Sequence, residues 1–403
     1  MARQPGLFHK ISSNHASRLR PSLPTGFLMK ITVIHPHELG EPELARWRSF
    51  QQATPALTNP FLSPEFSIAI GRLRTQARIA VLSDGPQIVG FFPFERRRFR
   101  GGVPIGAGLT DCQGLVHAPG LDWDPHELLR ACGLVHWEFD HLVDGQMPFN
   151  PYQTLRVTSP VMDLAGGFDA YLTELNRNSN GLNKGPIKKS LRGLQRKERG
   201  LALHTGELRF VFASCDHEAL HTLLMWKSAQ YLRTGVTDLF ARPWIVQLLE
   251  QLLDTGSDSC AGVLSILYAN GKPVAGHFGL RSDRVMVIWF PAYDRSFAKY
   301  SPGLLLHMRM AEAAAADGIH HIDMGRGTQD YKEMFKSRDL FVAEGRVVQR
   351  SPAAAFHWAR WTLERKLRCV AKEHPALYRV ASRLREHYGR IDSTLRRRGN
   401  VHH

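Results

Sequence analysis

Four side chains in the second half of the chain have the types that acid–base chemistry requires: His277, Asp323, Tyr331 and Lys332. An unperturbed imidazole titrates near neutrality, so His277 is the best-placed histidine to accept a proton. Asp323 is a second candidate base, or it could orient Lys332 or Arg326. Each also has a structural alternative. His277 could be a half-buried histidine of a strand, Asp323 could be the carboxylate that closes a glycine turn, and the Tyr331 hydroxyl could simply pack at the rim of the site.

The stretch 300–332 must position three of these side chains. Ser301 predicts a helix N-cap, and Pro302 is typical of a first helical turn. Apolar residues at helical spacing follow, and then a short apolar segment that predicts a buried strand. The glycines of Gly325–Gly327 predict a sharp turn at the end of that strand, directly before the tyrosine and the lysine.

The start of this helix is also a candidate phosphate site. A helix N-terminus presents unpaired N–H groups and about half a positive charge. Gly303 would let the backbone come close to a ligand. Charge-assisted bonds of roughly 1.5–3 kcal/mol each could come from Arg295, Lys299 and Arg326. The alternative is an ordinary capped helix with solvated basic residues.

Strand and helix patterns alternate along the rest of the chain. Helices are expected at 41–53, 125–133, 168–178 and 243–253, and after the caps Ser63 and Asp216. On one expected strand, Gly276 and Gly279 leave room beside His277. Strands are expected at 30–35, 77–83, 87–94, 136–142, 208–213, 262–268, 273–280, 284–290 and 341–349.

Composition limits the partners and the compartment. The chain has 403 residues, and its net charge of +15 favours a polyanionic partner, an acidic membrane face or a phosphorylated cofactor. Five scattered cysteines form no Cys-x-x-Cys pair, so neither a disulfide framework nor a metal site is expected. No run approaches ~18 uncharged apolar residues. We therefore expect a cytoplasmic protein without a transmembrane segment, at most peripheral to the inner membrane.

The two ends of the chain differ from its middle. Residues 1–28 combine basic and small residues without a continuous apolar stretch, which predicts a disordered leader rather than a secretory signal. Met29 directly precedes the first strand pattern and is a candidate start. Residues 351–403 predict a basic helical tail whose tryptophans, Trp358 and Trp361, favour docking on the core over a membrane surface or a partner.

A basic run lies between the two halves of the chain. It suits either a solvated helical face or an electropositive wall for phosphates or an anionic polymer. No helix-turn-helix, zinc finger or aromatic–basic platform is present, which disfavours DNA binding. The run consists of Lys184, Lys188, Lys189, Arg192, Arg196, Lys197 and Arg199.

A resemblance rests on Tyr300–Leu306, which reads YSPGLLL, together with the turn sequence DMGRG and the pair Tyr331-Lys332. In this order the motifs resemble the signature half of GNAT-type acetyltransferases of the cellulose-biosynthesis (CelD-like) family, which are related to FemAB-type transferases. The resemblance covers roughly residues 30 to 350. It implies an α/β (α+β) fold with tandem GNAT-like lobes, in which mixed sheets are flanked by helices.

The resemblance also implies a division of the chain into parts. The first lobe lacks the glycine–arginine turn, so it would shape the acceptor side rather than bind CoA. The second lobe would carry the acyltransferase site. The expected parts are a leader (1–28), an amino-terminal lobe (29–165), a basic helical linker (166–200), a carboxyl-terminal lobe (201–350) and a helical tail (351–403).

For the chemistry, the resemblance implies acetyl-CoA or another acyl-CoA as co-substrate, with direct attack by a hydroxyl or amine and no covalent enzyme intermediate. Tyr331 could then protonate the leaving thiolate, and Lys332 could bind a carboxylate or phosphate of the acceptor. Pantetheine would pair with a splayed strand, and the pyrophosphate would lie at a helix start. The implied cofactor-binding residues are Phe290, Pro291, Ala292, Tyr293, Lys299, Tyr300, Ser301, Pro302, Gly303, Leu304 and Arg326.

Three functions compete on the sequence alone. The first is acyl transfer to a hydroxyl or amine of a polysaccharide or its precursor, a saccharide or amine acceptor. The second is FemAB-type transfer from aminoacyl-tRNA; the basic run fits it, but the chain lacks the long helical hairpin expected of that group. The third is a non-catalytic GNAT-like scaffold subunit that docks on a polysaccharide synthase complex through the carboxyl-terminal helices. Cys260 is no candidate nucleophile, because no His and Asn or Asp partner pattern accompanies it.

Overall fold

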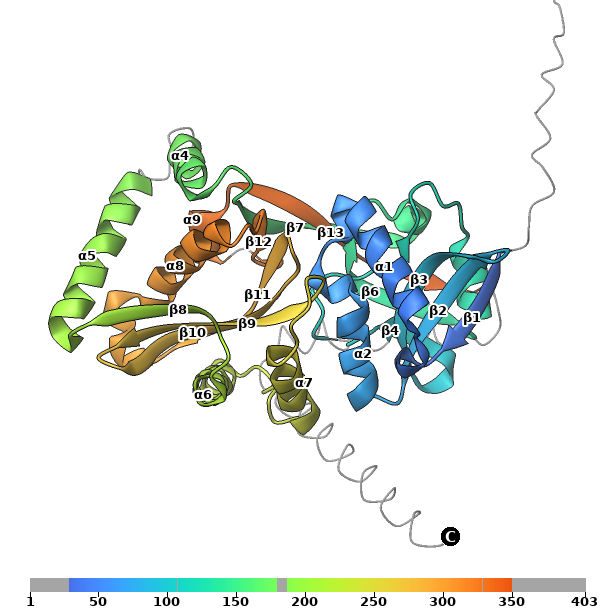
Figure 1. Ribbon diagram of the computed structural model, residues 1–403, viewed down its shortest axis with the longest axis horizontal. Helices are drawn as coiled ribbons and strands as arrows, with labels where there is room; N and C mark the ends of the chain where they lie inside the picture. Colours follow the sequence, from blue (N-terminus) through green and yellow to red (C-terminus); the bar gives the residue numbers. More distant parts are fainter. Residues whose placement is uncertain (1–28, 107, 180–186, 328, 350–403) are drawn as a thin grey trace, which may run out of the picture.

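The computed structural model describes residues 29–349 except 107, 180–186 and 328. Two halves of the chain lie side by side in Figure 1, the amino-terminal half at the blue end of the colour range. The predicted leader, the basic tail and Lys184 lie outside the described residues.

One mixed sheet runs through both halves in the order β1-β2-β3-β4-β6-β13-β7-β12-β11-β10-β9-β8, with β5 paired to β3. Most neighbours are antiparallel, but β4 and β6 are parallel, and so are β11 and β12. The strands are β1 (Lys30–Ile34), β2 (Ala77–Asp84), β3 (Gln87–Arg96), β4 (Gly101–Pro104), β5 (Val116–His117), β6 (His136–Val143), β7 (Gln153–Asp163), β8 (Leu208–Ser214), β9 (Ala261–Ala269), β10 (Lys272–Arg281), β11 (Val285–Tyr293), β12 (His321–Asp323) and β13 (Arg338–Val348).

Two long strands, β7 and β13, join the halves. β13 pairs with β6 on one side and with β7 on the other, and β7 also pairs with β12. Figure 1 shows β13 crossing from one half to the other. The two predicted lobes therefore share one sheet, because a strand from the end of the second lobe inserts between two strands of the first. The lobe boundaries stay a prediction.

The amino-terminal half packs three helices on its strands: α1 (Glu41–Ala53), α2 (Pro64–Leu73) and α3 (Pro125–Ala131). Trp47 anchors α1, since its ring stacks on Phe91 at 4.6 Å between centroids and its Nε1 donates to the Leu62 carbonyl at 2.8 Å. Ser63 caps α2 as predicted, because its hydroxyl accepts a hydrogen bond from the Phe66 N–H at 3.1 Å.

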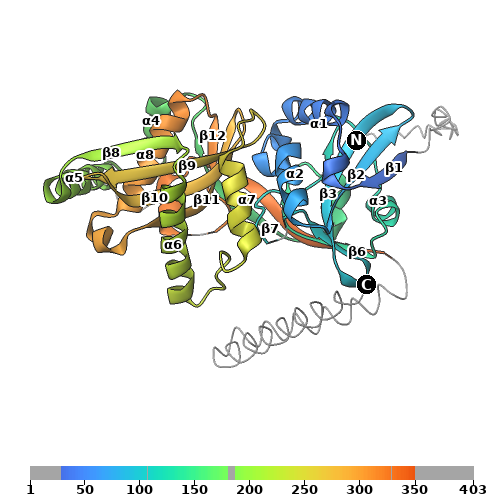
Figure 2. The same ribbon diagram turned by 60° about the horizontal axis from the view of Figure 1, so that its bottom comes forward.

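The carboxyl-terminal half covers both faces of its strands. One face carries α6 (His217–Thr234) and α7 (Pro243–Leu253), whose leucines pack in the same core as α1 and α2. The other face carries α4 (Phe168–Ser179), α5 (Ile187–Thr205), α8 (Pro302–Ala316) and α9 (Asp330–Phe335), which close a second core. Figures 1 and 2 show α6 on the side of the sheet opposite α8.

The predicted mixed α/β architecture is confirmed, and the strands and helices given by residue range lie within three residues of their expected ends. Two expectations need correction. β7 was not expected, because Pro160 weakens a strand pattern that shows no regular alternation. Ser301 occupies the N-cap position of α8, but its side chain makes no capping bond.

Candidate active site

The parallel strands β11 and β12 separate part-way along their length. β12 pairs with β11 only from Val285 to Val287, whereas β11 continues to Tyr293. Beyond Val287, no other strand in the described part of the chain takes the place of β12 beside β11. Because backbone N–H and C=O groups need partners, this free length of β11 suits an extended ligand with amide groups.

A β-bulge lies within the same free length. Phe278 and Gly279 are consecutive in β10, but they pair with Phe290 and Ile288, so Trp289 is an extra residue in β11. Such a bulge bends a strand and changes where its backbone groups point.

The start of α8 lies directly beyond β11. A 3-10 helix, Arg295–Tyr300, leads into Ser301, whose φ of 51° and ψ of 54° are left-handed values that cost a non-glycine residue roughly 1–3 kcal/mol. The Ser301 hydroxyl accepts a hydrogen bond from Lys197 Nζ at 2.6 Å, which replaces the predicted capping bond. Ser301 and Leu304 already donate their N–H groups to backbone carbonyls, so the helix start offers the Gly303 N–H and the positive end of the helix dipole, with an ammonium group beside them.

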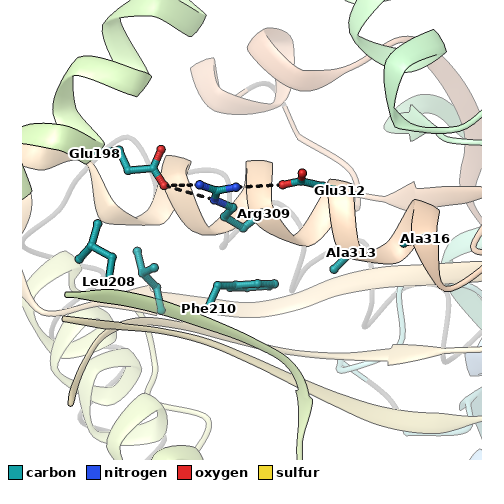
Figure 3. Close-up of a pocket in the computed structure, with 8 residues that line it drawn as sticks. Glu198, Leu208, Phe210, Arg309, Glu312, Ala313 and Ala316 are labelled. Carbon is teal, nitrogen blue, oxygen red and sulfur yellow. Dashed lines mark hydrogen bonds and ion pairs between the residues drawn. The ribbon is translucent and has the colours of Figure 1, made fainter. Parts of the chain in front are cut away.

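A salt bridge between α5 and α8 holds that lysine in place. Arg309 of α8 pairs with Glu198 of α5 at 2.7 Å and with Glu312 at 3.1 Å. Figure 3 shows Arg309 between the two glutamates, above a pocket of about 330 Å³ lined by Leu208 and Phe210. Because Glu198 follows Lys197 in α5, the salt bridge also positions the lysine against Ser301.

Most residues of the predicted cofactor set lie together. Phe290–Tyr293 form the free end of β11, and Lys299–Leu304 form the start of α8. A Cβ on Gly303 would lie 3.4 Å from the Tyr293 ring, so the strand end and the helix start are in contact. Arg326 points elsewhere, because its guanidinium donates to the Asp140 carbonyl at 3.0 Å and pairs with Glu344.

Asp323 and Lys332 meet at the glycine turn after β12. Asp323 is 5% exposed, and its Oδ1 accepts hydrogen bonds from the Gly325 N–H at 2.9 Å and the Ser159 hydroxyl at 2.6 Å. Lys332 is also 5% exposed, and its Nζ donates to the carbonyls of Gly325 and Arg326 at 2.8 and 2.9 Å. Both side chains therefore hold the shape of the turn.

His277 lies beside the bulge and has no exposed surface. Its Nε2 accepts a hydrogen bond from the Trp289 N–H at 3.3 Å. Burial lowers the pKa of His277 well below its usual value, with His307 and Lys227 adding to the effect. Lys227 of α6 reaches this region too, because its Nζ donates to the Pro291 carbonyl at 3.1 Å, and burial lowers the pKa of that lysine to about 8.

Tyr331 stacks on the buried His307 with 5.3 Å between ring centroids and 9° between planes. Burial raises the pKa of Tyr331 to about 12 and lowers the pKa of His307 to about 4. At neutral pH, Tyr331 is thus a neutral hydroxyl that can donate a proton, and His307 is a neutral imidazole. The catalytic roles expected of Tyr331 and His277 stay predictions.

Asp111, which no sequence pattern marked, also belongs to this group. Its Oδ1 lies 3.5 Å from His141 Nε2, and His141 Nδ1 lies 3.1 Å from Asp140 Oδ1. A Cβ on Gly325 would lie 3.4 Å from Asp111 Oδ2 and 3.9 Å from Lys332 Nζ. A loop of the amino-terminal half therefore brings a carboxylate to the glycine turn of the other half.

A cleft of about 1240 Å³ between the halves reaches this carboxylate. Asp111, Cys112 and Asp323 line the cleft together with residues of α1, β12 and β13. The Asp111 side chain keeps 31% of its surface exposed, in contrast to Asp323. Glycines on both sides of Asp111 were the only sequence signal, and they indicate a loop without saying what it contacts. Among the described residues, no group of three or more His, Cys, Asp or Glu side chains could hold a metal ion.

Residues 188–333 match the family of acetyltransferase (GNAT) domains. The chain carries a GNAT acetyltransferase domain. The matched residues include the separated strands, the start of α8 and the glycine turn. Such a domain implies an acyl-CoA-dependent acyltransferase, so acyl-CoA is the implied co-substrate.

Solved structures are similar to this chain at low sequence identity. FemX is 11% identical with a TM-score of 0.50, over 78% of this chain and 96% of that chain. A tandem GNAT protein from the clavulanic acid biosynthesis pathway is 10% identical with a TM-score of 0.44, over 80% and 98%. A conserved protein of unknown function from Bacteroides thetaiotaomicron is 11% identical with a TM-score of 0.45, over 78% and 100%. At 11% identity the likeness to FemX concerns the fold alone.

No curated protein matches the chain. In the described part of the chain, every helix is too short or too polar to cross a membrane.

Proposed function

We propose that this acyltransferase moves an acyl group, acetyl in the first instance, from CoA directly to a hydroxyl or amine of a second substrate. The observation that carries the proposal is the separation of β11 from β12 beside the start of α8. A free strand edge suits the amides of pantetheine, and a helix start suits a pyrophosphate. The two lie in contact, as one extended acyl-CoA molecule requires.

The residues at the helix start fit an anion. Lys197 lies on Ser301, and the exposed Lys299 is on the segment that leads into the helix. A charged hydrogen bond adds about 1.5–3 kcal/mol. Gly303 allows close approach, because a larger side chain there would meet both the Tyr293 ring and the ligand.

The reaction then needs positioning and a polarised carbonyl. Holding both substrates in line can lower the barrier by roughly 7–11 kcal/mol, and backbone N–H groups can stabilise the oxyanion. The attacking oxygen or nitrogen forms a bond to the carbonyl carbon, the carbon–sulfur bond breaks, and the electron pair leaves with sulfur. Tyr331 is the neutral donor for that thiolate. Asp323 and Lys332 hold the turn beside it, and His277 supports the bulge.

The acceptor is proposed to enter through the cleft between the halves. Its volume of about 1240 Å³ exceeds that of most small-ligand pockets, roughly 300–1,000 Å³. The size and the CelD-like resemblance support a saccharide or amino-sugar acceptor, as in polysaccharide biosynthesis. The amino-terminal half would shape the acceptor side, and the carboxyl-terminal half would bind acyl-CoA.

Calorimetry with acetyl-CoA tests the proposal. Wild type should bind saturably, and Gly303→Glu should lose at least tenfold in affinity, because the new carboxylate repels a pyrophosphate and blocks its approach. Gly256→Glu is the matched control, since Gly256 has open space around it and lies in a loop that lines the cleft. Thermal denaturation checks that all three proteins fold.

A folded wild type that binds neither acetyl-CoA nor longer acyl-CoAs would sink the proposal. Salt-dependent binding of aminoacyl-tRNA in its place would favour the FemAB-type function. Binding of neither ligand would favour a scaffold role.

A further inference from the structure

We propose that Asp111, on a loop of the amino-terminal half, is the catalytic base that takes the proton of the acceptor as it attacks the thioester. This assignment rests on the proposed acyl transfer. It makes the active site composite, with acyl-CoA held by one half and the proton acceptor supplied by the other.

The loop that carries Asp111 is tied to both sides of the site. Trp289, the bulge residue of β11, donates from Nε1 to the Leu109 carbonyl at 2.9 Å. Gln113 donates from Nε2 to Asp140 Oδ1 at 2.7 Å and accepts from the N–H groups of Asp140 and His141 at 3.0 and 3.1 Å. Asp111 lies between these two anchors, so its place is fixed relative to the strand along which acyl-CoA is proposed to bind.

Asp111 also differs from the other candidate bases in being open to a substrate. Oδ1 of Asp323 already accepts two hydrogen bonds at the turn, and the residue is almost fully buried. His277 has no exposed surface, and its Nε2 accepts the Trp289 N–H. Asp111 faces the cleft and keeps 31% of its side chain exposed. Asp323 also lines the cleft, but of these three groups Asp111 presents by far the most surface to an acceptor that enters there.

The surroundings of Asp111 suit a base at neutral pH. Part of the Asp111 side chain faces the cleft, but the protein around the rest of it removes water and so raises its pKa to about 6; Asp323 of β12 and Asp140 of β6 add to the rise, and His141 of β6 and Lys332 of α9 oppose it. Tyr231 of α6 also faces the carboxylate; burial raises the pKa of that tyrosine to about 12, and Asp238 and then Asp111 add to the rise. A pKa of about 6 leaves the group mostly ionised at pH 7 but much more basic than an ordinary aspartate.

The proton balance is simple. The acceptor N–H or O–H bond breaks as the new bond to the carbonyl carbon forms, and the proton moves to an Asp111 oxygen. The carbon–sulfur bond breaks, and the thiolate takes a proton from its donor, Tyr331. The proton on Asp111 leaves through the cleft to solvent, and the tyrosine is reprotonated from solvent.

Two probe nucleophiles separate this role from a structural one. Ethanolamine is protonated at pH 7 and needs a base, whereas hydroxylamine is mostly neutral and a strong nucleophile. Thiol release from acetyl-CoA is followed with each probe as a function of pH. In Asp111→Asn, release with ethanolamine should fall about 100-fold or more, and the acidic limb near pH 6 should disappear. Release with hydroxylamine should fall less than about 3-fold, because a neutral, strong nucleophile depends little on a base to remove its proton.

Asp84→Asn is the matched control, since Asp84 is exposed at the end of β2, does not line the cleft and should leave both rates unchanged. Equal losses with both probes, or no loss with either, would overturn the role of Asp111. Carbon-13 NMR of the aspartate carboxyls covers the case in which neither probe reacts. Loss of a carboxyl that titrates near pH 6 in Asp111→Asn supports the assignment, and the absence of such a carboxyl from wild type overturns it.

Calorimetry keeps the two proposals apart. Suppose that Asp111→Asn still binds acetyl-CoA but loses equal activity, or none, with the two probes. The role of Asp111 as base would then be wrong, while the proposed acyl-CoA binding would stand. A wild type that binds no acyl-CoA sinks the proposed function, and the base with it.

Discussion

The two halves each contain a parallel strand pair with a helix in the connection, but the helix starts are opposite in character. In the amino-terminal half, β4 and β6 pair in parallel and α3 lies between them in sequence. Asp124 caps α3 with its own carboxylate, at 2.8 Å from the Glu127 N–H. In the carboxyl-terminal half, α8 connects β11 and β12, and its start carries Ser301 and Lys197 in place of a carboxylate.

This contrast between the two helix starts indicates which half can hold an anion. A carboxylate at a helix start already uses the free N–H groups and the positive end of the dipole, so a phosphate would be repelled there. The start of α8 has no such carboxylate in its first turn and has an ammonium beside it. In the amino-terminal half, the long connection between β4 and β6 instead supplies Asp111 to the shared site.

The largest effect is expected from Lys332→Met. Lys332 Nζ is the donor to two carbonyls of the glycine turn, and leaving both buried without a partner should lower the free energy of unfolding by about 2–5 kcal/mol. Thiol release should also fall, because the turn would no longer hold its place beside β11. Chemical denaturation measures the first effect. Lys336→Met is the control at the same helix end, where half-buried ion pairs to Glu333 and Asp339 contribute less than about 1 kcal/mol each.

If Lys332→Met and Lys336→Met lose the same stability, the turn does not depend on Lys332. The start of α8 would then be the one remaining feature of this comparison that distinguishes the carboxyl-terminal half, because the lysine-held glycine turn would no longer count as a second.

A smaller effect is expected from Lys197→Ala. Removing the ammonium at the start of α8 should raise the Kd of acetyl-CoA about tenfold, or about 1.4 kcal/mol, and more at low salt than at high salt. Lys272→Ala, on the exposed start of β10, should leave the Kd unchanged. Calorimetry at two salt concentrations decides; an unchanged Kd for Lys197→Ala would remove the lysine from the phosphate site.

The smallest effect is expected from Asp124→Ser. Serine still caps a helix, so the free energy of unfolding should change by less than about 0.5 kcal/mol. The Kd of acetyl-CoA should not change, because α3 is not part of the site. A changed Kd would mean that the amino-terminal helix start also contacts the cofactor, and the contrast between the halves would fail.

Sequence patterns predicted the elements that have regular periods and clear ends. Caps, prolines and glycines act locally, and they therefore allowed us to predict the helices 41–53 and 243–253 and the turn at Gly325–Gly327. The insertion of β13 between β6 and β7 was not, since strand pairing depends on residues far apart in the chain.

The same distinction holds for the site. The pairing of Asp323 with the turn was a stated alternative, because both lie in one short segment. Asp111 meets Lys332 and Gly325 across more than 200 residues of chain, and no local pattern marks such a contact. Lys197 was recognised only as one charge in a basic run, and its contact with Ser301 depends on how α5 packs against α8.

Hydrogen exchange of the backbone amides, with and without saturating acetyl-CoA, would show which half of the chain binds the cofactor. We expect slower exchange in peptides that cover Phe290–Leu304, which hold the free edge of β11 and the start of α8, and no change in peptides that cover α3. Protection over α3 with none at Phe290–Leu304 would contradict the assignment of acyl-CoA to the carboxyl-terminal half.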